Sequence, residues 1–178
     1  MKSIVWFNGP SVKQFYNIPP QPLEIGCNFI LDHRKVHHVC AYDQQVITIL
    51  AKTPVEDVKY WTRKIFSQPN WRRTKKYPSY CSGTLALTVA YELGIKKCIL
   101  LGCDWHLTNA STYDEQYVWR KFQPKKHSAD KTRILTDLSR LMEITIVHAD
   151  HKRPFGPQVK WITPAEFMEG HNINMAQE

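Results

Sequence analysis

The stretch YCSGTLALTVAYELGIKKCILLGCDWH, which runs from Tyr80 to His106, decides the fold. The small residues Ser82 and Gly83 precede apolar residues at helical spacing, so a helix is expected to begin there. The next apolar run, Cys98–Leu101, is short and continuous, as in a central strand that is buried on both faces. Three residues with polar groups follow the strand and Gly102: Asp104, Trp105 and His106. Because ligands of open α/β sheets bind beyond the carboxyl ends of the strands, the stretch predicts one half of a nucleotide pocket.

The rest of the chain is expected to alternate strands with helices. Further strands are expected at Ser3–Phe7, Ile25–Ile30, His37–Tyr42 and Ile144–Val147. Helices are expected at Gln44–Leu50, from Thr53 onward, from Ser82 up to Gly94, and after Ser128 or Asp130. A strand within Val58–Ile65 is the alternative to the helix at Thr53. The pattern predicts an α/β fold with one Rossmann-like, mostly parallel sheet flanked by helices. We expect residues 1–178 to form a single domain, in which 150–178 is a peripheral tail.

Composition limits the class of protein. The 178 residues are 43% hydrophobic and 12% aromatic, which is typical of one globular domain with its own core. No apolar run reaches the roughly 20 residues that span a bilayer. The five cysteines include no CxxC pair, so we interpret them as mostly buried thiols in a reducing compartment, the cytoplasm. Neither a zinc spacing of cysteine and histidine nor an Asp-x-Asp pair occurs, so no metal or other cofactor is expected.

The net charge of +8 indicates a polyanionic partner. Seven cations and no acid lie between Lys59 and Lys76, with tryptophans between them that could stack on exposed bases. The predicted nucleic-acid-binding residues are Lys59, Arg63, Lys64, Trp71, Arg72, Arg73, Lys75 and Lys76. The alternative interpretation of this run is an ordinary solvated face.

Four short motifs recur along the chain in a fixed order. They are Asn8-Gly9-Pro10-Ser11 after the first strand, Cys27-Asn28 at the second, Ser82-Gly83 at a helix start and Gly102-Cys103-Asp104-Trp105 after a strand. Together with His127-Ser128 ahead of the last long helix, this order resembles the bacterial sialyltransferases of glycosyltransferase family 42. The resemblance covers roughly residues 1–148. It implies a sialyltransferase-like α/β domain that binds a CMP-sugar donor without a metal.

The resemblance also implies which residues bind the donor. They are Asn8, Gly9, Ser11, Asn28, Ser82, Gly83, Asp104 and Trp105. By analogy with the family, Asn8 and Asn28 contact the phosphate and ribose, and Asp104 holds the nucleotide. Asn8 and Asp104 each have a purely structural alternative, because asparagine and aspartate both stabilise turns.

Three further residues are implied to carry the reaction. Tyr113 matches one of two tyrosines that bind the leaving phosphate in the family, and His106 stands in place of the other. His127 falls where the family has its general base, although a surface position is the alternative. A neutral imidazole suits removal of the acceptor proton, and a helix N-terminus nearby disfavours its protonated form. The chain departs from the family at Ser79, where an arginine is expected.

These features leave three functions open. The preferred one is a metal-independent glycosyltransferase that moves a sugar from a CMP- or UDP-sugar to a hydroxyl acceptor. Basic charge favours DNA as the acceptor, through a hydroxymethylated base of the kind that phages decorate, in which case the enzyme acts in the host cytoplasm. The second is a sialyltransferase that acts on a glycan or lipooligosaccharide. The third is a non-catalytic nucleic-acid-binding module on the same fold.

Overall fold

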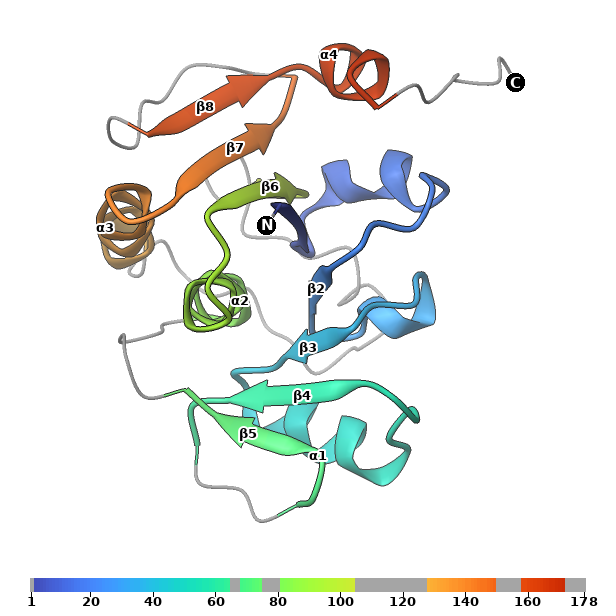
Figure 1. Ribbon diagram of the computed structural model, residues 1–178. Coiled ribbons are helices and arrows are strands. Elements are labelled where there is room, and N and C mark those ends of the chain that lie inside the picture. The colour runs from blue at the N-terminus through green and yellow to red at the C-terminus, as the bar shows by residue number, and fades with distance from the viewer. Residues whose placement is uncertain (1, 65–67, 75–80, 105–127, 150–157, 172–178) are drawn as a thin grey trace.

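The computed structural model describes residues 2–64, 68–74, 81–104, 128–149 and 158–171. Strands and helices alternate along them (Figure 1). The strands are β1 (Lys2–Trp6), β2 (Glu24–Cys27), β3 (His38–Cys40), β4 (Lys59–Thr62), β5 (Trp71–Arg73), β6 (Lys97–Leu101), β7 (Glu143–Val147) and β8 (Val159–Ile162). The α-helices are α1 (Gln44–Lys52), α2 (Ser82–Glu92), α3 (Ser128–Ser139) and α4 (Pro164–Glu169), and two 3₁₀ helices are η1 (Pro10–Phe15) and η2 (Ile30–Asp32).

The strands form one eight-stranded sheet in the order β5-β4-β3-β2-β1-β6-β7-β8. Every described pairing between neighbours is parallel. From β1 the chain builds outward to β5, and α2 then leads it back to β6, on the other side of β1. The point between β1 and β6 is therefore the topological switch point, beside which open α/β sheets bind their ligands.

Helices cover both faces of the sheet and give it two hydrophobic cores. In Figure 1, α2 and α3 lie on one side of the sheet, and α1 and α4 lie on the other. The first core contains Leu85 and Leu135 with Val5 of β1, and the second contains Ile47 and Phe167 with Trp6 of β1. Successive residues of β1 thus face opposite cores, as the period of a strand requires.

The structure confirms the predicted α/β class and the Rossmann-like parallel sheet. Helix α2 ends just before Gly94, whose φ of 77° is the left-handed conformation expected at a helix end. The helix expected from Thr53 onward is wrong, because no helix follows α1 before β4 begins at Lys59. The alternative strand within Val58–Ile65 is the one that forms, since β4 finds a partner on each side in β3 and β5.

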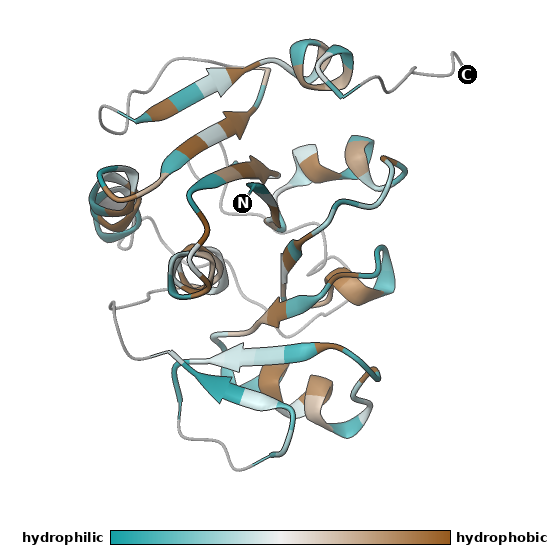
Figure 2. Cartoon of the chain, in the orientation of Figure 1, coloured by the Kyte–Doolittle hydropathy of each residue, from teal (hydrophilic) through white to brown (hydrophobic). Residues whose placement is uncertain are grey.

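The ends of the sheet come from parts of the chain where no strand was expected. Strand β5 forms one edge, and β8, from within the predicted tail 150–178, forms the other. Figure 2 shows that β4 and β5, at one end of the sheet, are more hydrophilic than β6 and β7. Helix α4 follows β8 and buries Phe167 fully in the second core.

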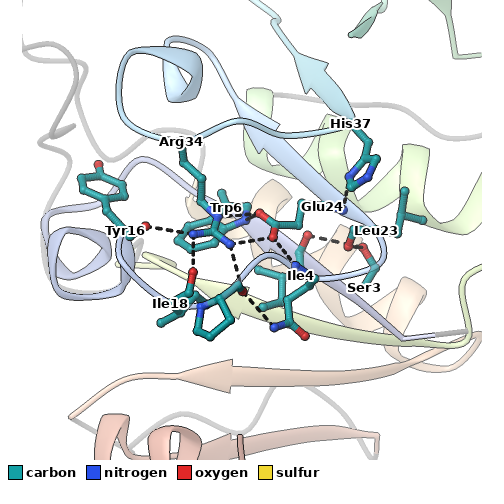
Figure 3. Close-up of polar contacts among 11 residues, drawn as sticks. Ser3, Ile4, Trp6, Tyr16, Ile18, Leu23, Glu24, Arg34 and His37 are labelled. Carbon is teal, nitrogen blue, oxygen red and sulfur yellow. Dashed lines mark hydrogen bonds and ion pairs between the residues drawn. The ribbon is translucent and has the colours of Figure 1, made fainter. Parts of the chain in front are cut away.

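A buried ion pair holds the connection between β1 and β2 (Figure 3). Arg34 donates to both carboxylate oxygens of Glu24 at 2.6 and 2.7 Å, and the two side chains are 8% and 2% exposed. Its remaining N–H groups donate to the carbonyl oxygens of Tyr16, Ile18 and Pro19. The indole N–H of Trp6 and the backbone N–H of Gln21 also donate to Glu24. All five guanidinium N–H groups are thereby used, which offsets the cost of burying the charges.

We expect Arg34→Met to lower the free energy of unfolding by roughly 3–5 kcal/mol, because the carboxylate of Glu24 would stay buried without its counter-ion. Urea denaturation measures this change. The control is Arg140→Met, which removes an exposed ion pair with Asp137 at 3.5 Å and should cost less than about 1 kcal/mol. Equal losses in the two variants would contradict a structural role for the buried pair.

Candidate functional site

The residues that follow β1, β2, β6 and β7 lie at the same edge of the sheet, because parallel strands end on one side. They include the turn Asn8–Ser11 after β1, Asn28 after β2, Asp104 after β6 and His148 after β7. Strand β1 pairs directly with β2 and β6, so the first three are neighbours at the switch point. We call this group the carboxyl-edge site.

Asp104 binds the turn after β1. Its Oδ2 accepts a hydrogen bond from the backbone N–H of Ser11 at 2.7 Å, and its Oδ1 accepts one from the Ser11 hydroxyl at 2.5 Å. The Nε2 atom of His148 lies 3.4 Å from the same Oδ1. Asp104 is only 4% exposed. Both oxygens are thus engaged within the protein, so these contacts favour the structural alternative, in which Asp104 holds a turn.

Gly9 is required where this turn meets β6. A Cβ atom at Gly9 would lie 2.5 Å from Asp104 Oδ2 and 2.5 Å from the carbonyl oxygen of Gly102. The Gly9 N–H donates to that carbonyl at 3.0 Å. Gly9 and Ser11 therefore position the turn. The half-buried Asn8 side chain differs from them, because it has no hydrogen-bond partner among the residues that the structure describes.

Asn28 is held in place by its backbone and by the amide oxygen of its side chain. Its φ is 52°, a left-handed value that asparagine tolerates, and its backbone N–H donates to the carbonyl of Cys40. The Ser82 hydroxyl accepts a hydrogen bond from the Tyr42 N–H and donates to Asn28 Oδ1 at 2.6 Å. Because the Ser82 hydroxyl donates the second of these hydrogen bonds, the Asn28 atom that faces it is the amide oxygen. The amide nitrogen has no partner within the described part of the chain.

The start of α2 lies against Asn28. Ser82 is the first residue of the helix and makes the contact described above, and Gly83 is buried beside it. The first backbone N–H groups of a helix have no partner inside the helix, and they carry a partial positive charge. The carboxyl-edge site therefore combines two asparagine amides with a helix N-terminus, a set of donors that suits oxygen atoms of a phosphorylated ligand.

Three buried cysteines of the sheet, Cys27, Cys40 and Cys98, are unreactive at neutral pH. None of the five cysteines forms a disulfide bond, and Cys27, Cys40, Cys98 and Cys103 are buried, as predicted. Burial raises the pKa of Cys27 and Cys40 well above the usual thiol value and that of Cys98 to about 12. These three thiols stay protonated at neutral pH and cannot serve as nucleophiles there.

The predicted nucleic-acid face needs one correction. Trp71 and Trp61 are only 8% and 6% exposed, so neither can stack on a base. Trp71 instead stacks on Tyr60 with 5.1 Å between ring centroids, and the Arg72 guanidinium lies 5.7 Å from the Trp61 ring centroid. The reason is the alternation of the strands, which points one tryptophan into each core. Five cations are exposed along β4, β5 and the residues after β4: Lys59, Arg63, Lys64, Arg72 and Arg73.

These cations do not all lie at the same place. Lys59 begins β4, whereas Arg63 and Lys64 follow its last residue. At about 3.3 Å per residue, the length of β4 separates Lys59 from the other two by roughly 13 Å. Arg63, Lys64 and Arg73 therefore lie at the carboxyl edge, on the side of β2 away from β1. We call Arg63, Lys64, Arg72 and Arg73 the basic edge.

Several predicted residues lie outside the described part of the chain. They are Trp105, His106, Tyr113, His127, Lys75 and Lys76. Within the described ranges, no group of three or more histidine, cysteine, aspartate or glutamate side chains is arranged to hold a metal ion. No helix in those ranges is long and apolar enough to cross a membrane.

Sequence reasoning missed His148. This residue directly follows the predicted strand Ile144–Val147, just as Asn8 follows Ser3–Phe7, so the same rule would have selected it. The link from the Tyr42 backbone to Ser82 had no such signal, because a main-chain donor is independent of residue type.

Comparison with known proteins finds no match to a family model, to a curated protein or to a solved structure. The resemblance to sialyltransferases therefore stays a prediction.

His38 gives a testable pH dependence beside the basic edge. Its Nδ1 accepts a hydrogen bond from the Trp61 indole N–H at 3.0 Å, which requires the neutral ring. Burial, with Lys59 and Arg72 nearby, lowers the pKa of His38 from 6.5 to about 4. Between these values the unfolded chain binds a proton that the folded chain does not, so stability falls as pH drops from about 6.5 to 4.

We expect His38→Asn, which keeps an acceptor for Trp61 but does not titrate, to lose about 2 kcal/mol of the change in stability between pH 7 and 5. Urea denaturation of both proteins at pH 7, 6 and 5 gives the difference, and His33→Asn on an exposed surface is the control. If the free energy of unfolding changes with pH by the same amount in the native protein and in His38→Asn, then His38 has the same pKa in the folded and unfolded chain. That result would contradict the prediction.

Proposed function

We propose that this protein is a metal-independent glycosyltransferase that moves a sugar from a CMP- or UDP-sugar to a hydroxyl acceptor. The observation that carries the proposal is the pair of asparagine amides at the ends of adjacent strands β1 and β2. Neither Asn8 nor the Asn28 N–H₂ group has a partner among the described residues. Ligands of open α/β sheets bind beside the switch point, so amide donors that the described residues leave available there support a ligand.

The chemistry of these donors favours a nucleotide with a phosphate. Amide N–H groups donate to phosphate and ribose oxygens, and the N-terminus of α2 attracts negative charge. The hydrogen bond from Ser82 to Asn28 fixes the helix start and one amide relative to each other. A donor phosphate bound between them would be stabilised without a cation.

The proposed reaction needs one base and one means of relieving charge on the leaving phosphate. By resemblance to family 42, His127 removes the proton of the acceptor hydroxyl, and Tyr113 and His106 donate to the departing phosphate. The metal-independent mechanism rests on that resemblance and on the lack of an Asp-x-Asp pair in the sequence.

For the acceptor we propose a hydroxymethylated base in DNA. The support is the basic edge, which contributes four exposed cations close to the carboxyl edge of the sheet. With both tryptophans buried, binding would rest on phosphate contacts, which are insensitive to sequence. A base inside a duplex must also be flipped out or exposed by fraying before its hydroxyl can react. The glycan acceptor and the non-catalytic module remain the alternatives that the experiments below separate.

We expect Asn28→Gly to weaken donor binding about tenfold or more, because glycine keeps the left-handed backbone but removes the amide. Thermal shift with CMP-, UDP- and GDP-sugars identifies the donor, since a ligand at 100 times its Kd stabilises by about 2.7 kcal/mol. Titration calorimetry with that donor then compares the variants. The control is Asp57→Gly, at the other non-glycine residue of positive φ in the described chain, 64°.

Turnover of the donor completes the test of the proposed mechanism. Hydrolysis or transfer of the identified sugar should continue at an unchanged rate in EDTA. A rate that collapses in chelator and returns with Mg²⁺ or Mn²⁺ would rule out the metal-independent mechanism. A protein that binds none of the nucleotide-sugars would refute the donor site itself.

We expect affinity for DNA to fall steeply with salt, and the triple variant Arg63→Ser, Arg72→Ser, Arg73→Ser to flatten the slope of log affinity against log salt. Each cation that touches phosphate adds about 0.9 to that slope, so the loss can reach about 2.7. The control replaces Arg133, Arg140 and Lys160 with serine, three exposed cations away from the basic edge that pair with Asp130, Asp137 and Glu143. Filter binding at several salt concentrations measures both. If the native protein retains no DNA, the glycan acceptor becomes the preferred one.

A further inference from the structure

His148 occupies a place that the proposed mechanism does not yet use. Its backbone N–H donates to the carbonyl of Ile162, which fixes it between the ends of β7 and β8. Its side chain is 6% exposed and places Nε2 3.4 Å from Oδ1 of Asp104. Three separate stretches of chain therefore meet at one carboxylate: the turn after β1, the end of β6 and the end of β7.

The carboxylate needs all of these neighbours because it is buried. Ser11 supplies two hydrogen bonds, and Gly9 lets the backbone approach closely enough for them to form. Loss of the imidazole would leave Oδ1 with the Ser11 hydroxyl as its only partner among the described residues. The imidazole lies against the carboxylate and forms an ion pair with Oδ1 when the ring is protonated, so without it the carboxylate would hold the turn less tightly.

We propose that His148 is a positioning residue for donor binding: through Asp104 and Ser11 it holds the turn that carries Asn8. This inference rests on the proposed function for its effect on the donor, although the hold on the turn is a property of the free protein. In this role His148 touches neither the sugar nor the nucleotide, and its imidazole transfers no proton.

The first experiment uses the free protein. Amide hydrogen exchange by NMR reports the Ser11 N–H, which donates directly to Asp104. We expect His148→Leu to speed this exchange about tenfold, and His148→Gln, which keeps an N–H donor, to stay within about threefold of native. Unchanged protection of Ser11 in His148→Leu would overturn the proposal.

The second experiment measures donor affinity by calorimetry, with the nucleotide-sugar found by thermal shift. His148→Leu should raise the Kd about tenfold, and His148→Gln should restore it to within about threefold of native. The matched control is His171→Leu, which removes a histidine paired with Lys2 at 3.0 Å, at the opposite end of β1. If donor binding weakened only through a general loss of stability, His148→Leu and His171→Leu would both weaken it. A positioning role predicts that His171→Leu binds the donor normally and that His148→Gln restores binding.

Ser11→Ala keeps the proposal testable if His148→Leu does not fold. It should weaken donor binding in the same way, and combining it with His148→Met, which has no N–H donor, should add no further loss. Independent, additive effects would overturn the inference, because residues that act through one carboxylate must be coupled. If no nucleotide-sugar binds the native protein, the proposed function fails, and the exchange of the Ser11 amide alone decides whether His148 holds the turn.

Discussion

The buried ion pair between Arg34 and Glu24 closes the crossover that leads from β1 to β2. The guanidinium binds the carboxylate at the start of β2 and, at the same time, the carbonyl oxygens of the segment that follows η1. An ion pair at this depth is tolerated because each donor and acceptor has a partner. The far end of the crossover is thus fixed. Asp104 fixes its near end, the turn after β1, through Ser11, so the crossover is held at both ends.

The carboxyl edge divides its polar groups into two kinds. Asp104, Ser11 and the Ser82 hydroxyl are engaged with other parts of the chain, and they account for how the strand ends are held together. The amides of Asn8 and Asn28 are left with donors that the described structure does not use. The resemblance to sialyltransferases groups all five as donor-binding residues. The contacts separate them into two groups. Asp104, Ser11 and Ser82 hold the strand ends together, whereas the amides of Asn8 and Asn28 have N–H groups that the described residues do not use.

The basic edge shows how one sequence feature can serve two physical purposes. An edge strand exposes unpaired backbone groups, and charged side chains such as Arg72 and Arg73 discourage another sheet from pairing with it. The same charges present an attractive surface to phosphate. Salt dependence separates these purposes, because protection of an edge needs no bound anion.

The local part of the fold could be read from the sequence. Helix α2, strand β6 and the glycine after each follow from helical spacing and a continuous apolar run within 27 residues, from 80 to 106. Asn8 and Asp104 were also predictable, since each follows an expected strand. Asn28 lies inside the expected strand Ile25–Ile30 and comes to the carboxyl edge because β2 ends at Cys27. What only the tertiary structure decided depends on distant partners. Strand β5 has three residues and forms by pairing with β4, and the direction of each tryptophan depends on which face its strand presents to which core. Ser11 and Asp104 are 93 positions apart, so nothing local shows that the carboxylate is already occupied by its own chain.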